Sequence, residues 1–338
     1  RRIGVIEIPK FYRDFEAAQA GERDFRSTTR DVKRLLDELL AEDIDGLLID
    51  LRDNSGGALR EATQLTALFT GGGPAVQVQN TRGNPERLGN PEQEMAYEGP
   101  LGVIVNRRSA SASEIFAAAI KDYDRGIVLG DQTFGKGTVQ QLINLNNYAI
   151  PGEERSGKLK LTLAQFYRVT GRSTQLQGVT PDIQLPSRFS HEEIGERAAN
   201  NPLPSNRIQA VGVPAYYQLE TLIDELQRRH KARMAEVETF QAFRRELAVQ
   251  RDIRDETTVA LDRATREEEQ EAREQRLLAI HNERRQAHGL EPLDSYDAID
   301  REELPDVQLQ MSAAIISDFS QLLAERGDEV LAAEAEAE

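Results

Sequence analysis

Three serines and a glutamate lie close together in the segment Ser109-Ala-Ser-Ala-Ser113-Glu114 of this 338-residue chain. The segment lies between an apolar run and an Ala-rich stretch, so its small residues permit a tight turn from a strand into a helix. A hydroxyl at a helix N-terminus suits a nucleophile, because free N–H groups and the helix dipole stabilise developing negative charge there. Ser111-Ala-Ser-Glu114 also matches the helix capping box, so capping alone is an alternative explanation of these serines.

A lysine between two glycines is the second candidate, in the segment Thr133-Phe-Gly-Lys136-Gly-Thr138. Lysine is ordinarily a solvated surface residue, so a turn lysine is the plain alternative. If the lysine is buried, desolvation lowers its pKa, and the neutral amine can act as a general base near neutral pH. The order Gly-Lys-Gly-Thr lacks the first glycine of a phosphate-binding loop, so the sequence does not predict ATP binding.

Paired glycines end a third segment, Asp50-Leu-Arg-Asp-Asn-Ser-Gly56-Gly57, which leaves a continuous apolar run. Two successive glycines let the backbone approach a ligand closely, with its N–H groups exposed. An ordinary strand-to-helix turn is the alternative explanation of this segment.

The histidines lie away from all three segments, at positions 191, 230, 281 and 288, and the chain has no cysteine. A Ser-His-Asp triad would therefore need a site built across two distant parts of the chain. No His-Glu-x-x-His motif or compact His/carboxylate cluster is present, so we expect no catalytic zinc, no other metal and no cofactor. A serine nucleophile would most simply take a lysine as its base, which is a known variant of the triad.

The elements that must position these segments alternate between apolar strands and helices, the pattern of an α/β layer fold. Strands are predicted at residues 3–8, 46–51, 101–105 and 127–129, and helices at 28–42, 59–69 and 113–123. Two further strands of more antiparallel character are predicted at 138–145 and 158–167. After Pro214 the sequence predicts mainly charged helices, the last of them over about 306–326.

Charge divides the chain into two unequal parts. Residues 1–190 carry 24 Lys+Arg against 25 Asp+Glu, whereas the remainder carries 18 against 33, out of a net charge of −16. We therefore expect a catalytic core over 1–190, a helical domain over 191–330 and a disordered tail over 331–338. Phosphates would be repelled by so acidic a chain, and no apolar run reaches the ~20 residues of a membrane helix, so neither nucleic acid binding nor a membrane span is expected.

Taken together, the motifs resemble those of the tail-specific proteases, also called carboxy-terminal processing peptidases. The resemblance covers about residues 1–187 and rests on four motifs in one order: the three segments above and Gly178-Val-Thr-Pro-Asp-Ile183. The helical second half resembles the C-terminal domain of the long periplasmic branch. The fold implied for residues 1–190 is a crotonase/Clp-protease-like layered α/β core with a mixed sheet, followed by a mainly α-helical domain.

The resemblance also implies roles for particular residues. The family's catalytic serine precedes the lysine by 25 residues, which selects Ser111 as nucleophile and Lys136 as base. Gln140, four residues after the lysine, helps to hold that lysine in the family. Asp122, eleven residues after the serine, is important in some members. The backbone N–H groups of Gly57 and Ala112 are the implied oxyanion hole.

The implied function is that of a serine endopeptidase that selects proteins by apolar, flexible C-terminal tails in the bacterial envelope, with periplasmic localisation. The implied partners are such substrates, an envelope adaptor lipoprotein and further copies of the chain. The family's PDZ domain precedes the catalytic strands, and this sequence starts where that domain would end, so we expect a processed chain or a fragment. A catalytically silent adaptor-binding or oligomerisation module is one alternative. An acyl-CoA enzyme of the same fold is another, although the Ser/Lys/Gln spacing favours proteolysis.

Overall fold

The computed structural model describes residues 1–81, 83–148, 157–301 and 304–337. Within these ranges the strands form two sheets. The first is parallel, in the order β1 (Ile3–Glu7), β2 (Gly46–Asp50), β5 (Leu101–Val105), β6 (Ile127–Gly130) and β9 (Ile183–Gln184). The second is antiparallel, in the order β4 (Pro85–Asn90), β3 (Gly73–Asn80), β8 (Lys158–Tyr167) and β7 (Thr138–Asn144).

Helices cover both faces of the parallel sheet. In chain order the helices of the core are α1 (Phe15–Gln19), α2 (Thr28–Leu40), α3 (Leu59–Thr70) and α4 (Ala112–Asp122), and those of the C-terminal region are α5 (Leu219–Glu236), α6 (Glu238–Arg254), α7 (Arg263–Ala287) and α8 (Val307–Ala337). Short 3₁₀ helices lie at Leu145–Tyr148, Glu196–Ala198 and Tyr296–Arg301. The layered α/β core followed by a helical region confirms the predicted fold class, with parallel and antiparallel pairings in separate sheets.

Successive residues of the central strands enter two different hydrophobic cores, because side chains alternate across a strand. Leu47 and Ile49 of β2 pack with α2, α3 and α4, whereas Leu48 between them packs with α5 and α8. Gly46 allows α8 to approach closely, since a Cβ there would lie 2.6 Å from a side-chain carbon of Ile316. The C-terminal helices therefore complete the core of the parallel sheet.

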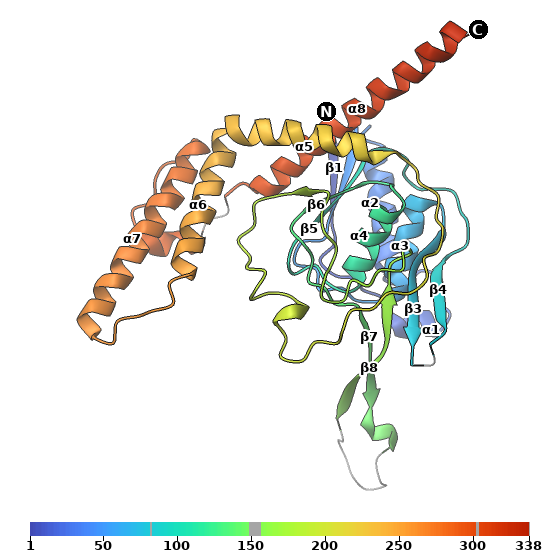
Figure 1. Ribbon diagram of the computed structural model, residues 1–338, viewed down its shortest axis with the longest axis horizontal. Coiled ribbons are helices and arrows are strands. Elements are labelled where there is room, and N and C mark those ends of the chain that lie inside the picture. The colour runs from blue at the N-terminus through green and yellow to red at the C-terminus, as the bar shows by residue number, and fades with distance from the viewer. Residues whose placement is uncertain (82, 149–156, 302–303, 338) are drawn as a thin grey trace.

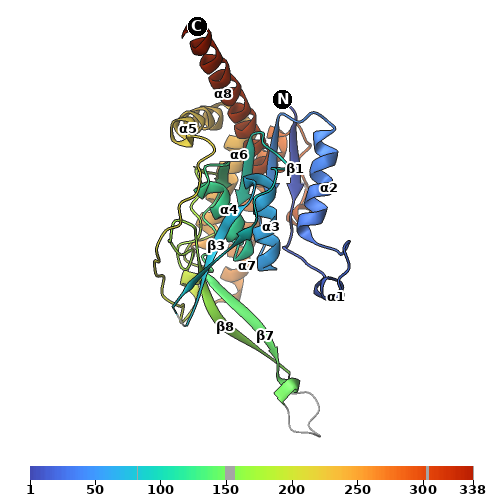
Figure 2. The same cartoon turned by 90° about the vertical axis from the view of Figure 1, so that its right-hand side faces the viewer.

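The α6–α7 pair, the β7–β8 hairpin and the C-terminal part of α8 extend away from this layered body (Figure 1). Helices α6 and α7 form an antiparallel pair to one side, and the β7–β8 hairpin projects from the opposite end from α8 (Figure 2). Within the described ranges, no helix is both long enough and apolar enough to span a membrane.

Helix α8 extends to Ala337, over residues that the sequence analysis assigned to a tail, and alanine and glutamate in this stretch are strong helix formers. The β3–β4 hairpin was not predicted, and its strands contain residues of low strand propensity such as Pro85 and Gly89.

Candidate active site

Ser111 lies in the tight turn that joins β5 to α4. Its backbone adopts φ 57° and ψ −110°, a conformation that a residue with a side chain rarely takes and that often occurs at functional sites. Gly56 permits this turn, because a Cβ on Gly56 would lie 2.7 Å from the Ala110 carbonyl oxygen and 2.9 Å from the Ser111 Cβ. The turn and the glycine-rich loop after β2 are therefore packed directly against each other.

A cavity of about 540 Å³ opens beside this turn, at the base of the β7–β8 hairpin. Ser111, Ala112, Gly57, Lys136 and Gln140 all line it, so the structure brings five of the six predicted site residues to one cavity. Apolar side chains make up much of the remaining wall: Phe15, Leu59, Ile115, Val139, Leu142 and Phe166. A chain segment with apolar side chains could therefore occupy this cavity.

Lys136 enters the cavity from the loop between β6 and β7. It is half-buried, and burial lowers the pKa of its amine; the nearby Lys160 charge lowers it further, while Glu196 and Glu114 act in the opposite direction. A lowered pKa increases the population of the neutral amine, which is the form that can accept a proton. The arrangement is suited to a general base.

Two backbone N–H groups beside Ser111 are available to an anionic oxygen. In the part of the chain that the structure describes, neither the Gly57 N–H nor the Ala112 N–H donates a hydrogen bond to another protein group. Asn54 fixes their surroundings: its Oδ1 accepts from Gly56 N at 2.8 Å, and its carbonyl oxygen accepts from Ser113 Oγ at 2.9 Å. These two donors could stabilise the oxyanion of an acyl-transfer reaction.

Gln140 and Asp122 take different places. Gln140 is exposed in β7, where its amide donates to Thr162 Oγ1 at 3.3 Å, across the pairing with β8. Asp122 ends α4, eleven residues or about 16 Å of helix beyond Ser111. Its carboxylate accepts from Arg168 Nε at 2.9 Å, and both side chains are largely buried in this ion pair. Asp122 therefore does not reach the cavity that holds Ser111 and Lys136.

Glu114 has a larger part in the site than the capping box suggested. Its side chain accepts a hydrogen bond from Ser111 N at 2.7 Å, as a capping box requires, but it is also completely buried and bonded to the lysine loop. Its burial depends on packing between distant segments, so the sequence signal identified only the cap. Among the described residues, no group of three or more His, Asp or Glu side chains could hold a metal ion.

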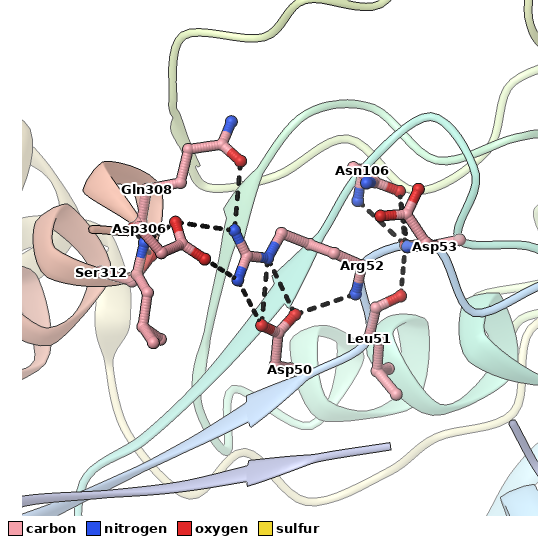
Figure 3. A network of polar contacts seen from close by, with 10 residues as sticks. Asp50, Leu51, Arg52, Asp53, Asn106, Asp306, Gln308 and Ser312 are labelled. Atoms are coloured by element: carbon pink, nitrogen blue, oxygen red, sulfur yellow. Dashed lines mark hydrogen bonds and ion pairs between the residues drawn. The ribbon is translucent and has the colours of Figure 1, made fainter. Parts of the chain in front are cut away.

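A polar network connects the C-terminal helices to the glycine-rich loop (Figure 3). Arg52 donates through Nη2 to Asp50 Oδ2 at 2.5 Å and to Asp306 Oδ2 at 2.6 Å, and Nη1 lies 3.3 Å from Gln308 Oε1. Asp306 also accepts from Leu309 N at 3.0 Å, at the start of α8. One arginine therefore joins the end of β2 to the first turn of α8.

Comparison with known proteins gives matches along most of the chain. Residues 2–185 match the family model described as Peptidase family S41, and residues 189–321 match the C-terminal domain of tail specific protease. A tail-specific protease from Haemophilus influenzae is 38% identical over 325 residues, covering 94% of this chain and 45% of that protein. A carboxy-terminal-processing protease from Bartonella bacilliformis is 34% identical over 181 residues, covering 52% of this chain and 40% of that protein.

Among solved structures, the photosystem II D1 C-terminal processing protease is 27% identical with a TM-score of 0.44, covering 54% of this chain and 42% of that one. The chain spans less than half the length of the two curated relatives named above.

Proposed function

Because this chain belongs to peptidase family S41, we propose that it is a serine endopeptidase in which Ser111 and Lys136 form the catalytic dyad. The observation that supports the proposal best is the shared cavity. It combines a hydroxyl at a helix N-terminus, a half-buried lysine of lowered pKa, and two N–H groups that have no acceptor among the residues the structure describes. The lysine takes the place that a histidine occupies in other serine proteases.

In the proposed mechanism the neutral Lys136 amine accepts the proton of Ser111 Oγ as that oxygen attacks the scissile carbonyl carbon. The resulting oxyanion accepts hydrogen bonds from the N–H groups of Gly57 and Ala112. The carbon–nitrogen bond then breaks, and the leaving amine takes the proton from the Lys136 ammonium group. Lys136 next deprotonates a water molecule, whose oxygen attacks the acyl carbon. The bond from that carbon to Ser111 Oγ then breaks, the acid is released, and the Lys136 ammonium returns its proton to Ser111 Oγ.

The proposed substrates are proteins with apolar, flexible C-terminal tails in the bacterial envelope, and the proposed location is the periplasm. The apolar wall of the cavity supports a preference for apolar side chains near the bond that is cut. The name of the Haemophilus influenzae relative supports selection by the tail. Under the same proposal, an envelope adaptor lipoprotein and further copies of the chain are its partners, and Gln140 helps to orient Lys136.

The test is cleavage of an unfolded reporter protein that carries either an apolar or a diacidic C-terminal tail. The parent chain is compared with Ser111→Ala, Lys136→Ala and the control Lys33→Ala, whose lysine is exposed on α2 and paired with Asp37. We expect the parent and the control to cut the apolar-tailed reporter faster, and each dyad variant to lose a factor of about 10³ or more.

Cleavage by Lys136→Ala at the parent's rate would refute the dyad. A folded parent that leaves both reporters intact would refute endopeptidase activity for this chain and favour the silent adaptor-binding or oligomerisation module.

A further inference from the structure

Glu114 is the third residue of α4, and its carboxylate is completely buried at the junction of two loops. Oε2 accepts hydrogen bonds from Ser111 N at 2.7 Å and Lys136 N at 2.9 Å. Oε1 accepts from Thr133 Oγ1 at 2.6 Å and Gly135 N at 2.7 Å. One side chain therefore receives four donors, and both of its oxygens are fully used.

Helix capping accounts for only one of these four hydrogen bonds. Of the four, a capping box uses only the bond from the Ser111 N–H, because its second bond runs from the N3 backbone N–H to the side chain of the N-cap residue. The other three donors belong to the loop between β6 and β7, which carries Lys136 and lies 19 to 22 residues further along the chain. The loop contains Gly135 at φ 93°, a conformation that favours glycine. Hydrogen bonds to a side chain outside the loop, such as Glu114, therefore help to hold the loop in this conformation.

We propose that Glu114 is a positioning residue that sets the separation between the Ser111 hydroxyl and the Lys136 amine by holding the backbone N–H groups of both residues on one carboxylate oxygen. The inference rests on the proposed function, because it assigns the geometry of the proposed dyad to a third residue. Ser111 has an uncommon backbone conformation, and the bond from its own N–H helps to maintain it.

The electrostatic surroundings of Glu114 are consistent with this role. Burial raises the pKa of its carboxyl to about 7, while the bonds from Thr133, Ser111, Gly135 and Lys136 act to lower it. The charges of Lys136 and Arg107 both interact with that of Glu114. Only the ionised carboxylate can accept all four donors, because a protonated oxygen would direct its own O–H toward another donor.

Glutamine at this position tests the idea, because it keeps the shape of the side chain and removes two acceptor lone-pair sites. Its NH₂ group must face two of the four donors, so at least one backbone N–H loses its partner. For Glu114→Gln we expect kcat on the apolar-tailed reporter to fall about 10²-fold with KM unchanged, since a displacement of about 1 Å at a catalytic group has an effect of that size.

A matched control exists in the same fold. Glu61 is also fully buried, and it accepts from Arg13 and Thr29, outside the cavity. Glu61→Gln should lower the melting temperature and leave kcat within threefold of the parent. If Glu114 acts through its charge alone, Glu114→Gln would shift the pH–rate profile toward lower pH without lowering its plateau, and that result would overturn the proposal.

Hydrogen exchange provides a readout that does not depend on catalysis. Loss of the anchor should accelerate amide exchange over residues 133–137 in Glu114→Gln, and leave exchange over α3 as in the parent. Unchanged exchange in that segment, or a kcat within twofold of the parent, would contradict the proposal. Should the glutamine variant fail to fold, the same measurements apply to Glu114→Asp, whose shorter side chain retains the charge but withdraws it from both loops.

The proposed function and the positioning role can fail separately. If amide exchange over residues 133–137 is faster in Glu114→Gln but the parent chain cleaves neither reporter, the peptidase activity is refuted, and Glu114 still holds the two loops together. Cleavage that depends on Ser111 but not on Glu114 would refute the positioning role alone.

Discussion

Replacing Gly57 by alanine should remove most of the activity while leaving the chain folded. Gly57 has φ 151°, and a Cβ built there would lie 2.0 Å from the Phe11 carbonyl oxygen. Real Cβ atoms essentially never approach closer than 3.0 Å, so the backbone has to move by about 1 Å. That carbonyl accepts a hydrogen bond from Ala58 N at 2.8 Å, so the movement is transmitted to the loop that presents the Gly57 N–H.

The size of the effect follows from what that N–H is expected to do. A displacement of about 1 Å takes one of two oxyanion donors out of position, and losing one such donor lowers kcat about 10²- to 10³-fold. The positive φ adds strain of about 1–2 kcal/mol for any residue with a side chain. A loss of 1 kcal/mol corresponds to about 2–4 °C in melting temperature for a domain of this size.

The assay is steady-state cleavage of the apolar-tailed reporter, with melting temperature measured on the same samples. Gly21→Ala is the matched control, because Gly21 has φ 79° but a Cβ there meets nothing within 4 Å. The control should lose similar stability and keep its kcat. A Gly57→Ala variant with a kcat within twofold of the parent would refute the role given to this N–H.

Other substitutions separate chemistry from structure. Burial lowers the pKa of Lys136, so the cleavage rate should rise with pH through that lowered pKa and then level off. Lys136→Arg should stay inactive throughout a pH–rate profile, because arginine remains protonated. Arg52→Met should lower the free energy of unfolding, measured by urea denaturation, by about 1–3 kcal/mol, with a value near the lower end because the Asp306 side chain is 42% exposed. Adding Asp306→Asn to that variant should lower the free energy of unfolding only slightly further. If the losses in free energy of unfolding caused by Arg52→Met and Asp306→Asn were fully additive in the double variant, that result would contradict an interaction between Arg52 and Asp306. Asp122→Asn should lower the melting temperature through its ion pair with Arg168 and leave kcat within about threefold, so a larger loss of kcat would place Asp122 in the chemistry.

Local signals explain why much of the core was predictable. The apolar strand at 101–105 has the predicted bounds in β5, and the helix predicted at 113–123 is α4, shifted by one residue. Each signal lies within about ten residues, where alternation, helical spacing and turn glycines act directly on the backbone. The segments that carry the serines and Lys136 were found in the same way, whereas the choice of Ser111 among the three serines came from the resemblance to the family.

The β3–β4 hairpin illustrates a limit of such signals. Its strand β3 also pairs with β8, whose partner residues lie 84 to 90 positions away, as in the pair Asn80 and Ala164. A pattern within one segment carries no information about such a partner.

The family, the alternating core, and the segments that bear serine, lysine and paired glycines could all be read from the sequence, because they depend on residue type and short spacing. Packing between distant segments decided that Glu114 would bond to both the serine turn and the lysine loop, and that Asp122 would pair with Arg168 outside the cavity. It also decided that Arg52 would join β2 to α8, across 254 residues of chain. The physical reason is common to all three. A buried polar group must find its partners among whatever segments the packing brings near, and that choice is made only when distant parts of the chain meet.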